Sequence, residues 1–492
     1  MDSLLFLCAR RIIAQRPLPS VPAGLYPVLF QVAFLDGRPL VLQDLVATWP
    51  FPVLHFQRLL GRPDVLWNRT CFGSVQAIIQ AVVAQLQREL EEPGSQSSLR
   101  VLDTTRLPDS VPFCTPTGIS SWCTTRDLAK ACMEVSKHQK EFQSCGSKPH
   151  KGRSGADMVT AAPQAPGVDI HTDLYVSGTS CWILHEALQA GATGLLRLKC
   201  REFQADNLSA SKIVTLLESL DPSCLRRVCL VENFLGLKGL LEILPHLSRF
   251  PELRSLKLWY NCVDLWHLTP ESTTGICCVA KQLGMLPSLR EFSLGSSKIS
   301  GNLRQILSDL QAPLESLELA FCSLIPDDLA FLSESFHAPA IKRLDLSGLD
   351  VSQGLLEPLR LLLEKTSASL LYLNLMDCHM NDSHLDALLP TLLRCSRLRY
   401  LRLHGNSLST AALKDLLQKT LELPDIHKVL YPCPVDCYKQ QPPESRRKFV
   451  HDRELFEAAV AEFSQILANS GRTDLIWTCT PIGCEALDYF SL

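Results

Sequence analysis

The sequence lacks any stretch that could cross a membrane or direct the chain into the secretory pathway. Among its 492 residues, no run approaches the roughly 20 apolar residues that a membrane-spanning helix needs. The apolar run Leu4–Cys8 is too short for a signal-peptide core, and the basic residues Arg10 and Arg11 follow it instead of preceding it. We therefore expect a protein of the cytoplasm, with the nucleus as a second compartment, and no membrane as a partner.

An excess of charge of one sign is also missing. Lys and Arg number 48, Asp and Glu number 51, and the formal net charge is −3. A strongly basic domain is the electrostatic signature of a nucleic-acid-binding protein. The balanced composition therefore makes nucleic acid an unexpected partner, while the 46% of hydrophobic residues suffices for a large buried core.

Motifs for catalysis and for metal binding are absent as well. There is no G-x-x-x-x-G-K-[ST], G-x-G-x-x-G, H-E-x-x-H or G-x-S-x-G. The 20 cysteines show neither the paired C-x-x-C spacing of a zinc site nor a disulfide framework. Many lie within repeated units, where a small apolar side chain fits a packed core. We expect reduced thiols, no cofactor, no metal and no enzymatic activity.

Leucine, by contrast, recurs at fixed intervals. A unit of the form L-x-x-L-x-L-x-x-N-x-L, with substitutions, begins at residues that are 28, 36, 25, 27, 29 and 28 positions apart. This is the pattern of a long leucine-rich repeat, in which each unit contributes one strand and one helix. The copies are Leu225–Leu235, Leu253–Val263, Leu289–Ile299, Leu314–Leu324, Ile341–Val351, Leu370–Met380 and Leu398–Leu408.

The repeats predict an α/β fold: a leucine-rich repeat solenoid, or horseshoe, with a helical N-terminal region and a C-terminal cap. Such a stack shares one continuous core, and its capping segments shield the ends. The expected organisation is a helical region at 1–92, a degenerate first repeat at 93–138, a flexible loop at 139–167, the solenoid at 168–431 and the cap at 432–492. The loop is expected because its sequence is rich in Lys, Gly, Ser and Pro and offers few apolar anchors.

Side chains alternate along a strand, so the third, fifth and seventh positions of each unit should face the inner surface of the horseshoe. Aromatic residues, Met and Arg are enriched at the centres of protein interfaces. The candidate residues for protein binding on this face are Trp259, Arg343, Tyr372, Met376, Tyr400, Arg402 and His404. The alternative is an ordinary sheet surface with two scattered tyrosines.

A second candidate site lies at the N-terminus. Leu4, Cys8 and Ile12 are four residues apart, which places them in one narrow stripe on a helix, with Ser3 at the N-cap position. This pattern is similar to the elongin-binding box of substrate receptors in cullin ubiquitin ligases. Downstream, Tyr26, Pro27, Phe30 and Phe34 resemble the companion cullin-2 box. The alternative is that both helices simply pack on the first repeat.

Several segments together resemble the family of the preferentially expressed antigen in melanoma. They are Leu25–Phe30, Trp49–Pro52, Leu314–Cys322, Leu344–Gly348, Pro434–Tyr438 and Asp488–Leu492. The resemblance covers nearly the whole chain apart from about 139–167. It implies a leucine-rich repeat fold without catalytic activity, and several members of the family resemble receptors that join elongin B/C to cullin-2.

The resemblance to one member of that family implies a negative regulator of Toll-like-receptor signalling to NF-κB. Its partner would be the beta subunit of the inhibitor-of-NF-κB kinase, bound through the helix-loop-helix region of the kinase. The alternative function is a substrate-recognition subunit of a cullin-2/elongin B/C ubiquitin ligase, and both functions are compatible with one chain. No local motif identifies a kinase-binding residue.

Overall fold

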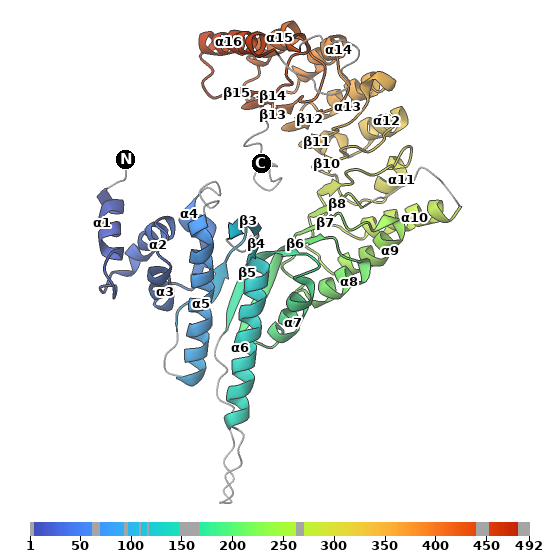
Figure 1. The fold of residues 1–492 in the computed structure, drawn as a ribbon. Coiled ribbons are helices and arrows are strands. Elements are labelled where there is room, and N and C mark those ends of the chain that lie inside the picture. Colours follow the sequence, from blue (N-terminus) through green and yellow to red (C-terminus); the bar gives the residue numbers. More distant parts are fainter. Residues whose placement is uncertain are drawn as a thin grey trace, which may run out of the picture. The chain divides into compact units, whose positions relative to one another are not determined.

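The computed structural model describes residues 4–61, 69–92, 97–107, 110–115, 118–146, 167–261, 270–438 and 452–480. The chain divides into two compact units, Met1–Val228 and Cys229–Leu492, and the boundary falls within strand β7, Arg227–Val231. In both units parallel strands alternate with helices (Figure 1). This alternation confirms the predicted leucine-rich repeat architecture.

The first unit begins with helices and continues as a parallel sheet in which β1, β2, β5 and β6 are neighbours in that order. Strands β3 and β4 form a separate antiparallel pair, and the helices α5 and α6 pack against each other (Figure 1). The helices are α1 (Leu4–Ile13), α2 (Tyr26–Leu35), α3 (Pro39–Ala47), α4 (Phe56–Leu60), α5 (Arg69–Glu91), α6 (Thr124–Gly146), α7 (Cys181–Gly191) and α8 (Ala210–Ser219). The strands are β1 (Val53–His55), β2 (Val101–Asp103), β3 (Ser110–Thr115), β4 (Gly118–Cys123), β5 (Val168–Val176) and β6 (Leu196–Asp206).

Three features of this unit differ from the sequence-based expectation. The region 1–92 is not purely helical, because β1 lies within it and adds a strand beside β2. That strand has three residues, too few to show the alternation that identifies strands. The pair β3 and β4 was not predicted. Helix α6 continues to Gly146, so the expected loop at 139–167 is helical in its first part, and 147–166 lies outside the described residues.

The second unit contains the regular repeats. Strands β8 to β15 pair in parallel in sequence order, and the helices lie along one side of them (Figure 1). The strands are β8 (Ser255–Trp259), β9 (Glu291–Ser293), β10 (Ser316–Glu318), β11 (Arg343–Asp345), β12 (Tyr372–Asn374), β13 (Tyr400–Arg402), β14 (Lys428–Leu430) and β15 (Ile476–Thr478). The helices are α9 (Gly236–Leu247), α10 (Pro270–Gly284), α11 (Leu303–Leu307), α12 (Pro326–Glu334), α13 (Leu356–Thr366), α14 (Asp382–Leu392), α15 (Thr410–Thr420) and α16 (Arg453–Ser470).

The register of these strands follows the repeat. Ser316 lies opposite Arg343, and Arg343 lies opposite Tyr372, so equivalent positions of successive units are aligned. The segments that begin at Leu314, Ile341 and Leu370 are therefore neighbouring parallel strands, as predicted. The inward positions of one unit, Leu370, Leu373 and Leu375, are all fully buried.

The eighth position of every unit has a left-handed backbone, which the sequence did not reveal. Glycine is the usual residue in this conformation, yet only two of the seven units have it. Gly405 is needed for space as well, because a Cβ there would lie 1.7 Å from Oδ1 of Asp377. The φ angles are 52° at Glu232, 53° at Tyr260, 59° at Ser296, 56° at Phe321, 74° at Gly348, 53° at Asp377 and 79° at Gly405.

The ninth position normally holds an Asn that donates to backbone carbonyls, and two cysteines replace it here. Asn406 donates from Nδ2 to the carbonyls of Leu375 and Leu403, both at 2.8 Å. Cys378 donates from Sγ to the carbonyl of Leu346, the equivalent of Leu375, at 3.4 Å and to the carbonyl of Met376 at 3.5 Å. Burial raises the pKa of the Cys378 thiol to about 12, so it stays protonated and able to donate.

Cys322 repeats this arrangement, with its Sγ 3.1 Å from the carbonyl oxygen of Leu294, and burial likewise raises its pKa to about 12. The loss of Asn at these two positions therefore does not interrupt the row of side-chain donors, because a thiol donates in its place. The row is interrupted at Ser297, whose buried hydroxyl has no hydrogen-bond partner, and at Leu349, which has no side-chain donor.

The last helix and strand close the second unit. Phe463 of α16 is fully buried, and its ring lies 5.4 Å from that of Tyr431 and 6.1 Å from that of Trp477. The side chain of Asp452 accepts hydrogen bonds from the first backbone amides of α16, as an N-cap does. Strand β15 pairs with β14, so the sheet runs one strand beyond residue 431, where the sequence predicts that the solenoid ends.

Replacing Cys378 by Ala should lower the free energy of unfolding by about 1 kcal/mol, because two backbone carbonyls lose a hydrogen bond. Cys378→Asn should retain most of the stability, since Asn406 makes the same contacts one unit away. Urea unfolding measures both changes. Cys8→Ala, at an exposed thiol, is the matched control and should leave the midpoint unchanged. Equal midpoints for wild type and Cys378→Ala would contradict the role assigned to the thiol.

Candidate protein-binding sites

The inner-face residues of β8 to β11 form a chain of buried charges. Nζ of Lys257 lies 3.0 Å from Oε1 of Glu291 and 3.2 Å from Oε1 of Glu318. Nε of Arg343 lies 3.0 Å from the same oxygen of Glu318. Burial alone would lower the pKa of Lys257, but the carboxylates of Glu318 and Glu291 outweigh it and raise that pKa above its usual value.

This chain continues through aromatic rings on β12 and β13. The guanidinium of Arg343 lies 4.5 Å from the ring centre of Tyr372, a cation–π contact. The hydroxyl of Tyr372 accepts a hydrogen bond of 3.2 Å from Nη1 of Arg402, and the rings of Tyr372 and Tyr400 are 6.4 Å apart. The candidate residues Arg343, Tyr372, Tyr400 and Arg402 on neighbouring strands therefore contact one another.

Two of the predicted contact residues are nearly inaccessible. Arg343 and Tyr372 are each only 3% exposed, so the prediction that they touch a partner directly is corrected. Side chains from the adjacent strands cover them, and the alternation of side chains along a single strand does not predict this cover. Arg343 and Tyr372 instead fix the positions of the side chains that they contact. The half-buried candidates are Trp259, Met376, Tyr400, Arg402 and His404.

Trp259 lies apart from the tyrosines and is fixed in place. Its indole N–H donates to the hydroxyl of Ser293, and Nζ of Lys257 lies 5.6 Å from its ring centre. A Cβ at Gly295 would approach its Cδ1 to 3.1 Å, so the glycine makes room for the ring. The candidates on the inner face thus fall into two groups, Trp259 on β8 and a patch of Met376, Tyr400, Arg402 and His404, which we call the tyrosine patch.

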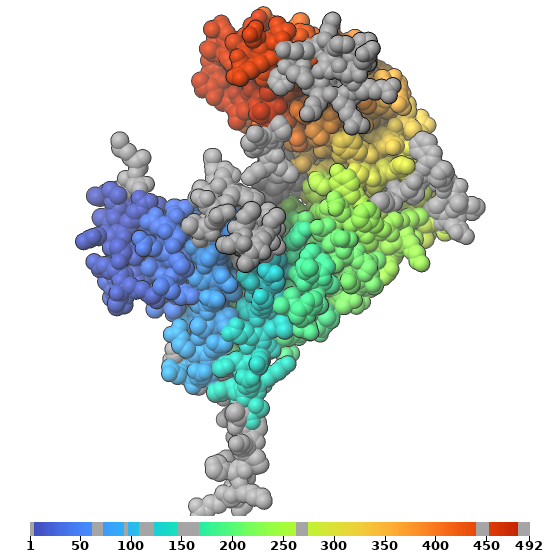
Figure 2. Space-filling model, viewed as in Figure 1, coloured from blue at the N-terminus to red at the C-terminus, as the bar shows by residue number. Residues whose placement is uncertain are grey.

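Helix α1 exposes an apolar side. Leu4 is 78% exposed, Cys8 is exposed, and Ile12 is half-buried, while Ser3 lies outside the described residues. Leu5 and Leu7 are also exposed, and sequence analysis missed them because they fall outside the four-residue spacing. The opposite side of the helix packs on α2, and in the space-filling view α1 lies at the edge of the first unit (Figure 2).

The residues of the cullin-2-type box are placed differently. Phe30 and Phe34 are fully buried, and their ring centres lie 5.7 and 5.9 Å from that of Phe56. The prediction that these two side chains contact a partner is therefore wrong, because they form the core between α2 and α4. Tyr26 and Pro27 are half-buried, so they alone of the box reach the surface.

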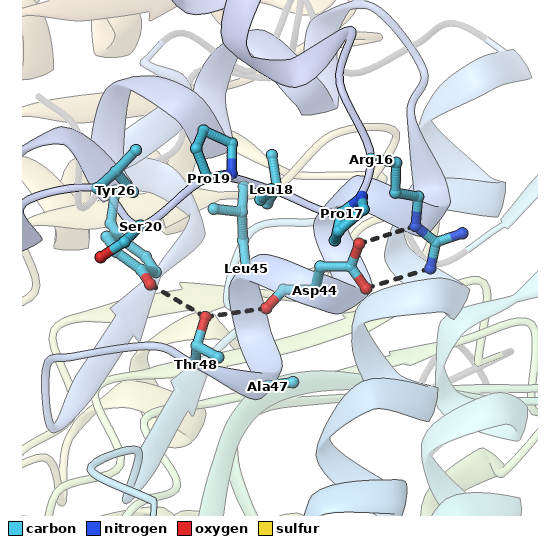
Figure 3. A pocket seen from close by; sticks show the side chains of 11 residues that line it. Arg16, Pro17, Leu18, Pro19, Ser20, Tyr26, Asp44, Leu45, Ala47 and Thr48 are labelled. Carbon is cyan, nitrogen blue, oxygen red and sulfur yellow. Dashed lines mark hydrogen bonds and ion pairs between the residues drawn. The ribbon is translucent and has the colours of Figure 1, made fainter.

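A hollow of about 800 Å³ lies beside Tyr26 (Figure 3). The Tyr26 and Thr48 hydroxyls are 3.0 Å apart, and Arg16 binds the carboxylate of Asp44 through two nitrogens at 2.8 and 3.1 Å. These contacts close one wall of the hollow and tie the Pro-rich turn after α1 to α3. It is lined by Arg16, Pro17, Leu18, Pro19, Ser20, Val21, Tyr26, Asp44, Leu45, Ala47 and Thr48.

Within the described part of the chain, no three His, Cys, Asp or Glu side chains are arranged to hold a metal ion. None of the described helices is both long and apolar enough to span a membrane. The described cysteines are free, and burial raises the pKa of the Cys132 and Cys395 thiols to about 12 and about 11.

The architecture and the inner-face geometry are those of a leucine-rich repeat protein, a class that binds other proteins on its sheet. Residues 6–109 match the PRAME N-terminal domain, and residues 184–488 match the PRAME C-terminal domain. The chain belongs to the PRAME family, the family of the preferentially expressed antigen in melanoma.

Several relatives are similar over their full length. Leucine-rich repeat-containing protein 14 of Bos taurus is 42% identical over 513 aligned residues, and that of Xenopus laevis is 41% identical over 513, each covering 100% of both chains. PRAME family member 8 of Homo sapiens is 30% identical over 451 residues, covering 89% of this chain and 87% of its own. This family is one of protein-interaction scaffolds, and no enzymatic family is indicated.

Replacing Lys257 by Met should lower the free energy of unfolding by about 3 kcal/mol at neutral pH, because two buried carboxylates lose their shared cation. Because the pKa of Lys257 is raised, its stabilising effect is fully present below pH 10.5 and is lost as the pH rises through the raised pKa. Chemical unfolding at neutral pH and above pH 10.5 measures the trend, with Lys238→Met on α9 as the control. A pH-independent difference would contradict the charge chain.

Proposed function

We propose that this chain is a non-catalytic protein-binding regulator with two separate binding surfaces. The tyrosine patch on the inner face of the second unit binds the target. The exposed side of α1 binds elongin C, which joins the target to a cullin-2 ubiquitin ligase. The observation that carries the proposal is the solvent exposure of four apolar side chains on one short helix: Leu4, Leu5, Leu7 and Cys8.

The exposed side of α1 supports a partner of its own. Burying a single leucine side chain is worth about 2 kcal/mol, so three exposed leucines in the first turn of α1 favour a partner that covers them. Helix-in-groove recognition uses such a stripe, and Cys8 is small enough to let a partner approach closely. The spacing of Leu4, Cys8 and Ile12 is that of the elongin-binding box. Of the cullin-2-type box, only Tyr26 and Pro27 remain available.

The proposed target is the beta subunit of the inhibitor-of-NF-κB kinase, held in the cytoplasm through its helix-loop-helix region. In this role the chain restrains Toll-like-receptor signalling to NF-κB. The full-length identity of 41–42% with leucine-rich repeat-containing protein 14 supports this choice of target. Simple occupation of the kinase surface would suffice for inhibition, whereas the α1 surface would add ubiquitination and turnover of the target.

Changing Leu4 and Cys8 to Ser should abolish co-purification of elongin C and lengthen the lifetime of the target, because two polar side chains would enter an apolar groove. Affinity purification from cells and a cycloheximide chase measure the two effects. Leu361→Ser with Leu455→Ser makes a comparable change at two exposed leucines of the second unit and is the control. If the α1 variant still co-purified as much elongin C as the wild type, the ligase role would be ruled out. If the variant still repressed NF-κB as strongly as the wild type, binding to the kinase surface alone would suffice for inhibition.

Replacing Tyr400 and Arg402 by Ala should weaken binding of the kinase beta subunit by about 2 kcal/mol or more, if the tyrosine patch is the centre of that interface. Surface plasmon resonance with purified proteins measures the change. Elongin C binding should stay intact, which shows that the variant is folded. Undiminished kinase binding would remove the tyrosine patch from the target-binding surface.

A further inference from the structure

The second position of each repeat lies at the edge where the strands begin, and these positions form a continuous row. The backbone N–H of Arg290 donates to the carbonyl of Arg254 at 2.8 Å, and that of Glu315 donates to the carbonyl of Arg290 at 2.8 Å. The same bond recurs at each following strand. The row therefore runs, strand by strand, through Arg254, Arg290, Glu315, Lys342, Leu371, Arg399 and His427.

This edge is basic over β8 to β13. The segments between the preceding helix and each of these strands are 248–254, 285–290, 308–315, 335–342, 367–371 and 393–399. They carry seven basic residues and three acidic ones, although the whole chain has a net charge of −3. The basic residues are Arg249, Arg254, Arg290, Lys342, Arg394, Arg397 and Arg399, and the acidic ones are Glu252, Asp309 and Glu315. We call this surface the basic edge.

The opposite edge, where the strands end, has the reverse charge. From the end of each of β9 to β13 to the first turn of the next helix, the chain carries six acidic residues and two basic ones. Charge is therefore sorted across the sheet, from basic at the strand starts to acidic at the strand ends. The acidic residues are Asp327, Asp328, Asp350, Glu357, Asp377 and Asp382, and the basic ones are Lys298 and Arg304.

Most of the cations on the basic edge are accessible. Arg254 and Arg397 are exposed, and Arg399 is half-buried. Arg254 has one long contact of 3.5 Å with Glu252, whereas Lys342 is neutralised by Glu315 at 2.6 Å. Neighbouring strands lie about 4.8 Å apart, so the five spacings between Arg254 and Arg399 span about 24 Å, the reach of roughly seven extended residues.

We propose that the basic edge binds an extended acidic segment of a partner protein. This surface is distinct from α1 and from the tyrosine patch, so the inference goes beyond the proposed function. Arg254 and Arg290 at one end of the row and Arg399 near the other, with Glu315 and Leu371 between them, complement carboxylates along an extended chain. Its partner is a polypeptide in preference to a nucleic acid, because the acidic opposite edge repels a long polyanion and the row holds no Phe, Tyr or Trp on which bases could stack.

The test measures binding of the full chain to a fluorescein-labelled peptide of about eight residues that alternates glutamate and glycine, a length set by the strand spacing. Fluorescence anisotropy should show saturable binding that weakens with added salt, as contacts between exposed charges do. Arg254→Glu with Arg399→Glu should reduce the affinity roughly tenfold or more. Arg254→Lys with Arg399→Lys should retain it, because the charges remain.

The matched control is Lys238→Glu with Lys281→Glu, which changes the net charge equally on α9 and α10 and should leave the affinity unchanged. Equal losses in both charge-reversed proteins would show that only net charge matters, and the proposal would fail. It would also fail if the peptide did not bind, or if a single-stranded DNA oligonucleotide bound more tightly than the peptide. Circular dichroism of each variant verifies that a loss of binding is not a loss of fold.

Discussion

Burial of leucine between successive repeats is the constraint on which the second unit depends. Each strand from β8 to β15 has three to five residues, too few to be stable alone, and its inward leucines pack against those of the units on either side. Because the register is set by this packing, equivalent positions fall into straight rows across the strands. The charge chain, the tyrosine patch and the basic edge are all consequences of that alignment.

Alignment brings together charges that are far apart in sequence. Lys257 and Glu318 are separated by 61 residues, yet they meet because one strand lies between them. Such a buried chain of charges is satisfied only while each member keeps its neighbours, so it favours one register over others. The same alignment at the strand starts places basic residues in a line. The near-zero net charge of the chain reveals neither the charge chain nor the basic edge, because it adds up charges that the fold places on different surfaces.

The repeat pattern predicted the fold well. The strands that begin after Leu314, Ile341 and Leu370 and the inward leucines all lie where the spacing places them. Strand β1 and the pair β3 and β4 could not be predicted, because they lie outside the consensus. Cys322 and Cys378 depart from the Asn of the repeat unit, and the geometry shows each thiol donating to the carbonyl at the sixth position of the preceding unit. The repeat consensus specifies Asn at the ninth position, but the hydrogen bond to the carbonyl requires only a protonated donor at that place.

The candidate sites were predicted less completely. The four-residue spacing identified the exposed stripe of α1 but missed Leu5 and Leu7. The alternation of side chains along the strands identified the inner face but did not show that Arg343 and Tyr372 are buried there. Phe30 and Phe34 fit a binding motif and lie in the core, since an aromatic residue on a short helix satisfies both patterns equally well. The solvent exposure of a side chain depends on how the elements pack, and the pattern of a single sequence does not specify that packing directly.

The central claim is that two separate surfaces bind two different proteins. Hydrogen–deuterium exchange of the intact chain, measured with elongin B/C and then with the kinase beta subunit, tests it most directly. The account predicts slowed exchange at Leu4–Ile13 with the first partner and at β12 to β14 with the second. Protection of the same residues by both partners, or protection of neither surface, would contradict it.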